Sequence, residues 1–546
     1  MSETEKLNPT FRYLAKTENE AALDILFAGL KCSDKKTRSQ SLRAILDRRS
    51  SAAHVKIFQR LDKFDEDARD IIKERSDRLV PAATAALADN DDGRFVAACK
   101  SIVSYNLYEA VAPLVAVLPE VSESRAEVVA AAILKLTEAF YAELSGATRD
   151  ASQKGQEAVR IKMTAALEDA VRKFYRHQRL EVIEAFLTIS KQKNLTLRQM
   201  LMRSEEASHQ PILDVLTQSS SGGVLRLLLS FLEDAQMPGC VAGLFSTRSD
   251  RKFVENFLRV VSPRPSRNVC ETIRRFKSFD WAEPGHEVLQ SLDDLEQAIA
   301  VRLVTGSGMG RAEALELVGY MLLEGKPGGR KAAAAALRSF EGHAAAALTI
   351  KGLQDSEPEV LAPLIEQLRP RKVAGAYGIL IRMVDNPSPV VHEALRKAMP
   401  EFTFRQFLTN FDSMDEDLQP IAGHIVRKID DGVSEKILEE FSGLSPVRRR
   451  KAILAAGAMG MVPELEQEIV KLLSDEDHMV RVEVAKVLAD SKSAPTWEAL
   501  QDALLDKSFA VKEAVEQSLD RISKPLVVDA EEETEENAEP EEVTRV

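Results

Sequence analysis

The strongest constraint on the fold of this chain is a segment that occurs twice in nearly the same form, 31 residues apart. Residues 472–490 read LLSDEDHMVRVEVAKVLAD, and residues 503–521 read ALLDKSFAVKEAVEQSLDR. Aligned on each other, they place Asp475 opposite Asp506 and match Val with Val or Leu with Leu at three later positions. A repeat of this length indicates a supersecondary unit that is used more than once.

Two earlier copies carry Asp355 and Asp385 at the same fourth position. The four copies begin at 352, 382, 472 and 503, so two more copies are expected in the wide central gap. One is visible at 413–429, and the other is blurred around 445–460. A sustained period of about 30 residues is typical of a solenoid of stacked units.

Each copy has the features of two helices joined by a short polar turn. Val480, Val484 and Leu488 recur at helical spacing, and the acidic run SDED before them suits a helix start. One hairpin buries about half a dozen apolar side chains at roughly 1.5–3 kcal/mol each, whereas ordering about 30 residues costs on the order of 1 kcal/mol or more per residue. Neighbouring units must therefore cover its exposed face. We expect Val484 to lie inside, and Glu483, one step round the helix, to tolerate a change of charge.

The pattern L-x-D-x-x-x-x-V-[R/K]-x-x-V-x-x-x-L resembles the HEAT-repeat family, in particular its short bacterial HEAT-like type. The resemblance implies an all-α fold, an α-solenoid or superhelix of stacked helical hairpins. It also implies a polar ladder between repeats, made by the turn Asp and a base six residues later. Asp475 with Arg481 and Asp506 with Lys512 match this ladder. Two earlier repeats have an apolar residue in place of the base, so the ladder is expected to be partial.

The resemblance is strong in the C-terminal half and weaker near the N-terminus. We therefore expect degenerate HEAT-like repeats at 1–120, an irregular central helical region at 121–325, C-terminal HEAT-like repeats at 326–525 and a disordered acidic C-terminal tail at 526–546. Within the central region, residues 124–147 and 155–191 are predicted to form long helices.

The amino-acid composition limits the class of fold, the kind of partner and the cellular location that we expect. Only 5% of the residues are aromatic and alanine is abundant, which suits close-packed helices. The net charge of −13 opposes binding of nucleic acid or anionic membrane by the whole surface. The four cysteines include no C-x-x-C pair, and no run reaches the roughly 18 apolar residues of a membrane span. We expect a cytoplasmic protein without membrane insertion.

Motifs for catalysis or cofactor binding give no clear candidate. Residues 305–311, TGSGMGR, partly fit a glycine-rich phosphate loop, but the helical spacing before them favours a loop between helices. The eight histidines form no H-x-x-x-H pair, and no G-x-S-x-G elbow occurs. We therefore predict a non-enzymatic protein with no catalytic residues, no cofactor and no metal site.

Two basic clusters are candidate contacts for a partner. The first lies in VRKFYRHQR, and its cations are Arg172, Lys173, Arg176 and Arg179. The second opens a helix, where cations oppose the helix dipole, and consists of Arg448, Arg449, Arg450 and Lys451. A solvated helix face is the alternative interpretation of both clusters.

The predicted function is a scaffold that holds a macromolecular partner, expected to be a protein, on the surface of a HEAT-like solenoid. The prediction rests on the habits of the resembled family and on the missing catalytic motifs, because a fold alone does not define a function. Two alternatives stay open. One is a relative of the HEAT-like phycobilin lyases, and the other is a DNA-binding HEAT protein that uses the basic cluster.

Overall fold

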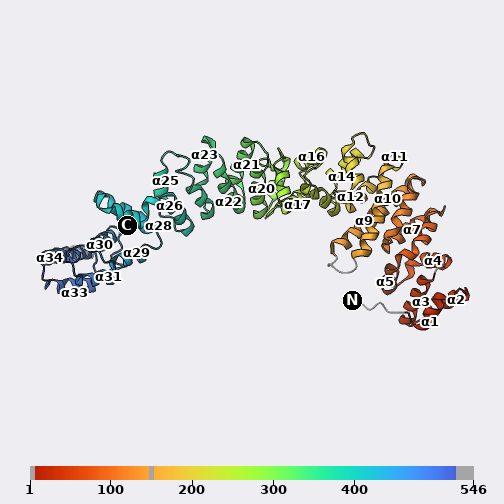
Figure 1. Cartoon of the computed structure of the whole chain (residues 1–546), viewed down its shortest axis with the longest axis horizontal. Helices are drawn as coiled ribbons and strands as arrows, with labels where there is room; N and C mark the ends of the chain where they lie inside the picture. Colours follow the sequence, from red (N-terminus) through yellow and green to blue (C-terminus); the bar gives the residue numbers. More distant parts are fainter. Residues whose placement is uncertain (1–6, 49, 147–152, 263, 524–546) are drawn as a thin grey trace, which may run out of the picture. The chain divides into compact units, whose positions relative to one another are not determined.

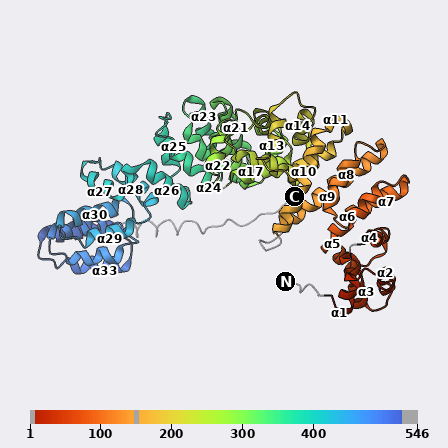
Figure 2. The same cartoon turned by 45° about the vertical axis from the view of Figure 1, so that its right-hand side comes forward.

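The chain is entirely helical in the part that the structure describes. The computed structural model describes residues 7–48, 50–146, 153–262 and 264–523, and within these ranges it contains helices and turns but no strand. The chain forms two compact units, Met1–Ala314 and Leu315–Val546. Figures 1 and 2 show the helices of each unit as consecutive hairpins. The all-α prediction is therefore confirmed, whereas the predicted acidic tail at 526–546 lies outside the described residues.

Unit 1 consists of short helices and two long ones, α9 and α10. Its helices are α1 (Pro9–Lys16), α2 (Ala21–Gly29), α3 (Lys35–Asp47), α4 (Ser51–Phe58), α5 (Glu66–Glu74), α6 (Val80–Leu87), α7 (Asp92–Ser104), α8 (Val111–Val117), α9 (Glu123–Gly146), α10 (Gln153–Arg172), α11 (Phe174–His177), α12 (Leu180–Ile189), α13 (Leu195–Met202), α14 (His209–Gln218), α15 (Gly222–Ser230), α16 (Gly239–Thr247), α17 (Arg251–Val261), α18 (Arg267–Ile273), α19 (Glu287–Ser291) and α20 (Asp294–Gly306).

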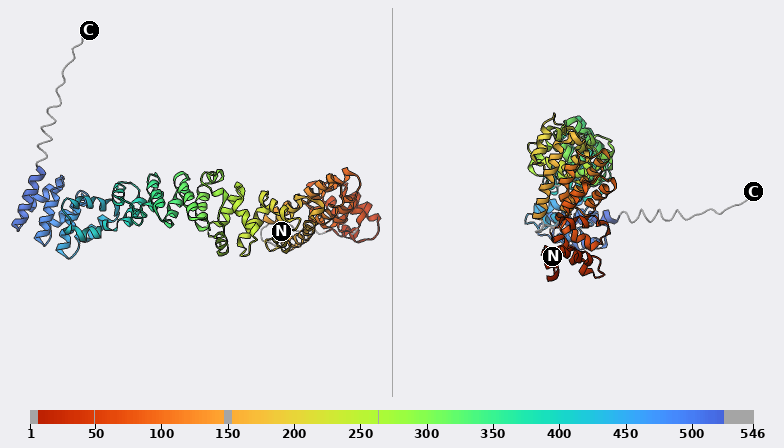
Figure 3. Two further views of the ribbon diagram at one scale, coloured as in Figure 1. Left: turned by 90° about the horizontal axis from the view of Figure 1, so that it is seen from above. Right: turned by 90° about the vertical axis from the view of Figure 1, so that its right-hand side faces the viewer.

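Unit 2 is more regular. After α21 (Arg311–Glu324), which contains the boundary, its helices are α22 (Pro327–Ala336), α23 (His343–Gly352), α24 (Pro358–Ile365), α25 (Ala376–Arg382), α26 (Pro389–Ala398), α27 (Phe404–Asn410), α28 (Leu418–Ile429), α29 (Val433–Phe441), α30 (Pro446–Ala458), α31 (Glu466–Lys471), α32 (His478–Leu488), α33 (Ala494–Ala503) and α34 (Phe509–Ser523). The even-numbered helices from α22 to α34 each pack on the next one. The last of them, in blue, lie side by side in Figure 3.

The apolar face predicted for the last repeats forms their core. Val480, Val484 and Leu488 of α32 are fully buried, and they belong to one apolar cluster with Val511 of α34. Neighbouring hairpins therefore supply the cover that one hairpin lacks. Glu483 differs from expectation, because its side chain is only 13% exposed and lies 3.6 Å from the ammonium of Lys486.

The long helix predicted at 155–191 is wrong in part, whereas α9 matches the one predicted before it. The segment forms α10, α11 and α12. Helix α11 ends at His177, and the φ of 50° of the next residue, Gln178, lies in the left-handed region. The His177 ring binds the Ala170 carbonyl at 3.1 Å and accepts a hydrogen bond from the Arg179 amide at 3.1 Å. This local side-chain cap competes with continued helix, and apolar spacing does not reveal it.

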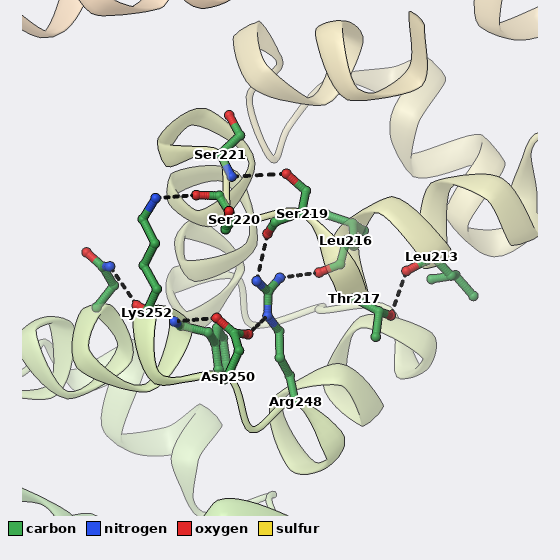
Figure 4. A network of polar contacts seen from close by, with 11 residues as sticks. Leu213, Leu216, Thr217, Ser219, Ser220, Ser221, Arg248, Asp250 and Lys252 are labelled. Atoms are coloured by element: carbon green, nitrogen blue, oxygen red, sulfur yellow. Dashed lines mark hydrogen bonds and ion pairs between the residues drawn. The ribbon is translucent and has the colours of Figure 1, made fainter. Parts of the chain in front are cut away.

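An arginine network joins two hairpins in the middle of unit 1 (Figure 4). Arg248, between α16 and α17, is 3% exposed, and its guanidinium donates hydrogen bonds to the main-chain carbonyls of Leu216 at 2.6 Å and Ser219 at 2.7 Å. The same guanidinium binds the carboxylate of Asp250 at 2.5 Å, which in turn caps the start of α17 through the Phe253 amide. The network satisfies carbonyls at the end of α14 that have no partner within their own helix.

Candidate binding surfaces

The structure divides the first basic cluster. Arg172 donates to the hydroxyl of Thr196 at 2.6 Å, and the Lys173 ammonium pairs with Asp169 at 2.6 Å, one turn earlier on α10. Arg176 lies over the ring of Tyr175, 5.7 Å from its centroid. These three cations are exposed, so their charges reach solvent even where a carboxylate neutralises them in part.

Arg179 does not belong to the same exposed group. Its side chain is 13% exposed and pairs with the carboxylate of Glu123, at the start of α9. It also donates to the Glu123 carbonyl at 3.2 Å. This guanidinium therefore ties α9 to the turn before α12, while its buried Nε has no hydrogen-bond partner among the described residues.

The second basic cluster, at the start of α30, is also divided. Arg448 is the most exposed member and pairs with Glu440. Arg449 is 14% exposed and donates two hydrogen bonds to the carboxylate of Asp475, at 2.7 and 2.8 Å. Arg450 is half-buried, and Lys451 pairs with Asp412 at 2.6 Å. The four consecutive cations of this cluster therefore lie in different surroundings.

A ladder of arginines and aspartates links the turns of the last repeats. Arg481 binds Asp506 of the next hairpin at 2.8 and 2.9 Å, as Arg449 binds Asp475. Burial would raise the pKa of Asp475, but the hydrogen bonds from Arg449 and from the Asp477 amide outweigh it, so this pKa lies below its ordinary value. The hydrogen bond from Arg481 lowers the pKa of Asp506, and the charge of Lys512 adds to this effect.

A further rung, Arg330 with Asp355, was missed in the sequence. The guanidinium of Arg330 binds this carboxylate at 2.7 Å and also donates to the Gly325 carbonyl of its own turn at 3.1 Å. Arg330 stands 25 residues before its aspartate, the same separation as Arg481 and Asp506. That separation could have identified the pair, whereas a base sought six residues after Asp355 falls on Leu361.

The glycine-rich segment 305–311 runs from the end of α20 to the start of α21, so a helix and not a strand precedes its loop. The Gly308 amide donates to the Phe276 carbonyl at 2.9 Å, and a Cβ at Gly308 would come 2.4 Å from the Arg274 carbonyl oxygen. Glycine is required here for close packing of two chain segments. An amide bonded in this way is not available to a phosphate.

A groove of about 810 Å³ crosses α4 to α7 in the N-terminal repeats. Its floor includes the buried rings of Phe58 and Tyr105. Charged side chains at its rim include Arg69, Arg94 and Lys100. Its walls are rich in small side chains, namely Ala82, Ala85, Ala86, Ala97 and Ala98. We call it the α4–α7 groove.

Sequence reasoning missed this groove because it took alanine only as a sign of close helix packing. On α7, small residues recur at 97, 98, 101 and 104, which is the spacing of one helical face. A face of small side chains that no neighbouring helix covers leaves a hollow, and its volume lies within the about 300–1,000 Å³ range of ligand-binding clefts.

Two other kinds of feature are absent from the described residues. No group of three or more His, Cys, Asp or Glu side chains there has the arrangement of a metal site. In the same part of the chain, no helix is long and apolar enough to cross a membrane.

Comparison with known proteins identifies a class of repeat. Stacked hairpins linked by an Arg–Asp ladder define an α-solenoid repeat, and the family model described as HEAT repeats matches residues 434–520. In this range the chain is similar to HEAT repeats, which confirms the resemblance predicted from the sequence. No curated protein sequence matches the chain.

Solved structures with helical repeats also align with the chain at low identity. One comes from work on a conserved phosphorylation switch that controls the interaction between cadherin and beta-catenin; it covers 92% of this chain and 99% of its own, at 11% identity and a TM-score of 0.31. A crystal structure of Kap121p covers 95% of this chain and 53% of its own, at 12% identity and a TM-score of 0.23. The karyopherin Kap121p bound to the extreme C-terminus of the protein phosphatase Cdc14p aligns with 13% identity and a TM-score of 0.21, over 95% and 62% of the two chains.

Proposed function

We propose that this chain is a non-enzymatic protein-interaction scaffold that binds a segment of a partner protein in the α4–α7 groove. The observation that carries the proposal is the groove itself, with its volume of about 810 Å³, its buried aromatic floor and its alanine walls. Small walls let a peptide backbone approach closely, and the charged rim supplies orientation.

The exposed cations form the second part of the proposal. Arg172, Lys173 and Arg176 in unit 1 and Arg448 in unit 2 are proposed to contact acidic parts of the partner. Such contacts affect the rate and the specificity of association more than its affinity. Four free cysteines support the cytoplasmic, reducing location proposed from the sequence.

The test blocks the groove without unfolding it. Ala97 is exposed on α7 within the groove, so Ala97→Trp should fill the hollow. Ala88 is exposed at the end of α6 and does not line the groove, so Ala88→Trp is the matched control. Proteins captured by the full-length chain are compared by quantitative mass spectrometry, and a candidate is then purified and titrated against each variant.

The proposal predicts a partner that the wild type and Ala88→Trp bind equally and Ala97→Trp binds at least about tenfold more weakly, a difference of 1.4 kcal/mol. Equal binding by all three proteins would overturn the assignment of the groove. Unchanged melting of Ala97→Trp, followed by circular dichroism, checks that the variant is folded.

A further inference from the structure

A small basic pocket lies beside the groove, on the other side of the start of α5. It opens between the turn that joins α2 to α3 and the turn that joins η1 (Leu61–Lys63) to α5. Its volume is about 270 Å³. Five cations line it: Lys31, Lys35, Arg38, Arg60 and Lys63. We call it the α2–α5 pocket.

Only two carboxylates share the pocket with these cations, and both are engaged. Asp67 pairs with the ammonium of Lys35 at 2.6 Å. Asp65 caps α5 by accepting from the Ala68 amide at 2.9 Å, and it lies 3.5 Å from a guanidinium nitrogen of Arg38. These pairs neutralise two of the five cations, which leaves a local charge of about +3.

The excess charge belongs to Lys31, Arg60 and Lys63. All three are exposed, and no carboxylate of the described residues lies in ion-pair contact with them. The turn that carries Lys31 is held in place by hydrogen bonds from Arg38 to the carbonyls of Cys32 and Ser33, at 3.0 and 2.8 Å. The turn that carries the other two cations is closed by a hydrogen bond from the Lys63 amide to the Arg60 carbonyl at 3.0 Å. The pocket therefore presents positive charge from two fixed turns.

The floor of the α2–α5 pocket is apolar. Phe27, Leu30 and Phe64 line it and are half-buried. The Lys56 ammonium lies 5.6 Å from the centroid of the Phe27 ring, so one face of this ring already has a cation beside it. The volume is below the roughly 300 Å³ at which small-molecule clefts begin, which suits one bulky side chain.

We propose that the α2–α5 pocket takes one bulky apolar side chain of an acidic peptide segment, whose flanking carboxylates are bound by Lys31, Arg60 and Lys63. The inference rests on the proposed function and names the chemistry of the partner. An acidic peptide is favoured over a nucleic acid because the whole chain has a net charge of −13, which opposes the binding of a long phosphate backbone. A short peptide can place its few acids toward the free cations and away from Asp65 and Asp67.

The test uses the full-length chain and fluorescein-labelled synthetic peptides, with binding followed by fluorescence anisotropy at low and at moderate salt. The first peptide is rich in Asp and Glu around one central Phe. The second has Ala in place of Phe, the third has Lys in place of each acid, and an oligothymidylate of equal length is the nucleic-acid probe. We expect the acidic Phe peptide to bind about fivefold or more tightly than the Ala peptide, and the Lys peptide not to bind. Added salt should weaken binding of the acidic Phe peptide.

Paired variants separate the pocket from general surface charge. Lys63→Glu reverses one pocket cation and should weaken the acidic Phe peptide by about fivefold, the upper range of one exposed ion pair. Lys73→Glu makes the same change at an exposed position near the end of α5, outside the pocket lining, and should leave the affinity unchanged. Phe64→Leu should remove the preference for Phe while keeping the charge.

Several outcomes would overturn the inference. If Lys63→Glu and Lys73→Glu weakened binding of the acidic Phe peptide equally, the affinity would come from the general surface charge and not from the pocket. Equal affinity for the Phe and Ala peptides would exclude the apolar subsite, and tighter binding of the oligothymidylate would assign the cations to nucleic acid. The proposed function fails separately, when Ala97→Trp leaves partner binding unchanged.

Discussion

The last repeats of unit 2 and the middle of unit 1 both join consecutive hairpins through arginine, but the arginines bind different acceptors. In unit 2, Arg449 and Arg481 reach carboxylates of the next hairpin, Asp475 and Asp506. In unit 1, Arg248 reaches main-chain carbonyls of the preceding hairpin. Arg226 has the same arrangement and donates to the carbonyls of Thr188 and Ser190 at 3.1 and 2.9 Å.

The acceptor affects how easily a repeat can be recognised in the sequence. A carboxylate acceptor requires Asp at one position of every repeat, and this requirement leaves a visible period. A carbonyl acceptor is supplied by every residue type, so the sequence is free to diverge around it. Stacked hairpins therefore continue through residues where no period can be seen.

The largest effect is expected when the core of unit 2 is broken at Val484. Val484→Asp places an unpaired carboxylate at a fully buried position and should destabilise unit 2 by at least about 4 kcal/mol. Each unit contains one Trp, so unfolding of unit 2 can be followed by Trp497 fluorescence in a Trp281→Phe background. Lys486→Ala on the exposed face of α32 is the control and should change stability by less than about 1 kcal/mol. Similar losses in both variants would contradict the assigned face.

Removing the Arg248 network should lower the free energy of unfolding of unit 1 by nearly as much. Arg248→Met leaves two carbonyls without their donors and should destabilise unit 1 by about 3 kcal/mol. Lys252→Met removes one exposed bond to the Ser220 carbonyl in the same network (Figure 4) and should cost less than about 1 kcal/mol. Denaturant unfolding is followed by Trp281 fluorescence in a Trp497→Phe background. If Arg248→Met costs no more than Lys252→Met, the carbonyl bonds of Arg248 do not stabilise unit 1 in the way that the Arg–Asp ladder stabilises unit 2.

The unit 2 ladder, unlike the carbonyl network, should depend on pH. The folded-state pKa of Asp475 lies below its ordinary value of 3.8, so its contribution is fully present above pH 3.8 and is lost as the pH falls through the folded-state pKa. Asp475→Asn should destabilise unit 2 by about 2 kcal/mol at pH 7. The difference from the wild type should close below pH 3.8. A difference that stays constant down to pH 3 would indicate that the charge of Asp475 is unimportant.

The smallest change in stability is expected when each of two adjacent arginines, Arg448 and Arg449, is replaced by lysine. Arg449→Lys keeps the charge but loses the paired hydrogen bonds to Asp475, and it should cost about 1 kcal/mol. Arg448→Lys changes an exposed ion pair with Glu440 and should cost less than about 0.5 kcal/mol. Thermal unfolding of unit 2 measures both. Equal values would mean that the ladder needs only a cation at this position.

The sequence predicted the helical hairpins and their buried face well, because both follow from apolar spacing. The sequence showed the cations at 448–451 as one cluster. It did not reveal their separate partners, because Glu440, Asp475 and Asp412 lie on three different hairpins. The α4–α7 groove and the α2–α5 pocket were missed for a related reason. Each depends on which helix faces are left uncovered after stacking, and this is a property of several hairpins at once.

The long helices α9 and α10 have a consequence for the order in which unit 1 folds. Elsewhere the arginine links between hairpins join residues 25 to 40 positions apart, as in Arg330 with Asp355 and Arg275 with Ala235. Around α9 and α10 the separations grow to 53 for Lys162 with Glu109 and 81 for Tyr141 with Gly222. Closing longer loops costs more chain entropy before any contact is gained. We therefore expect the segment around these helices to form later than the hairpins on either side of it.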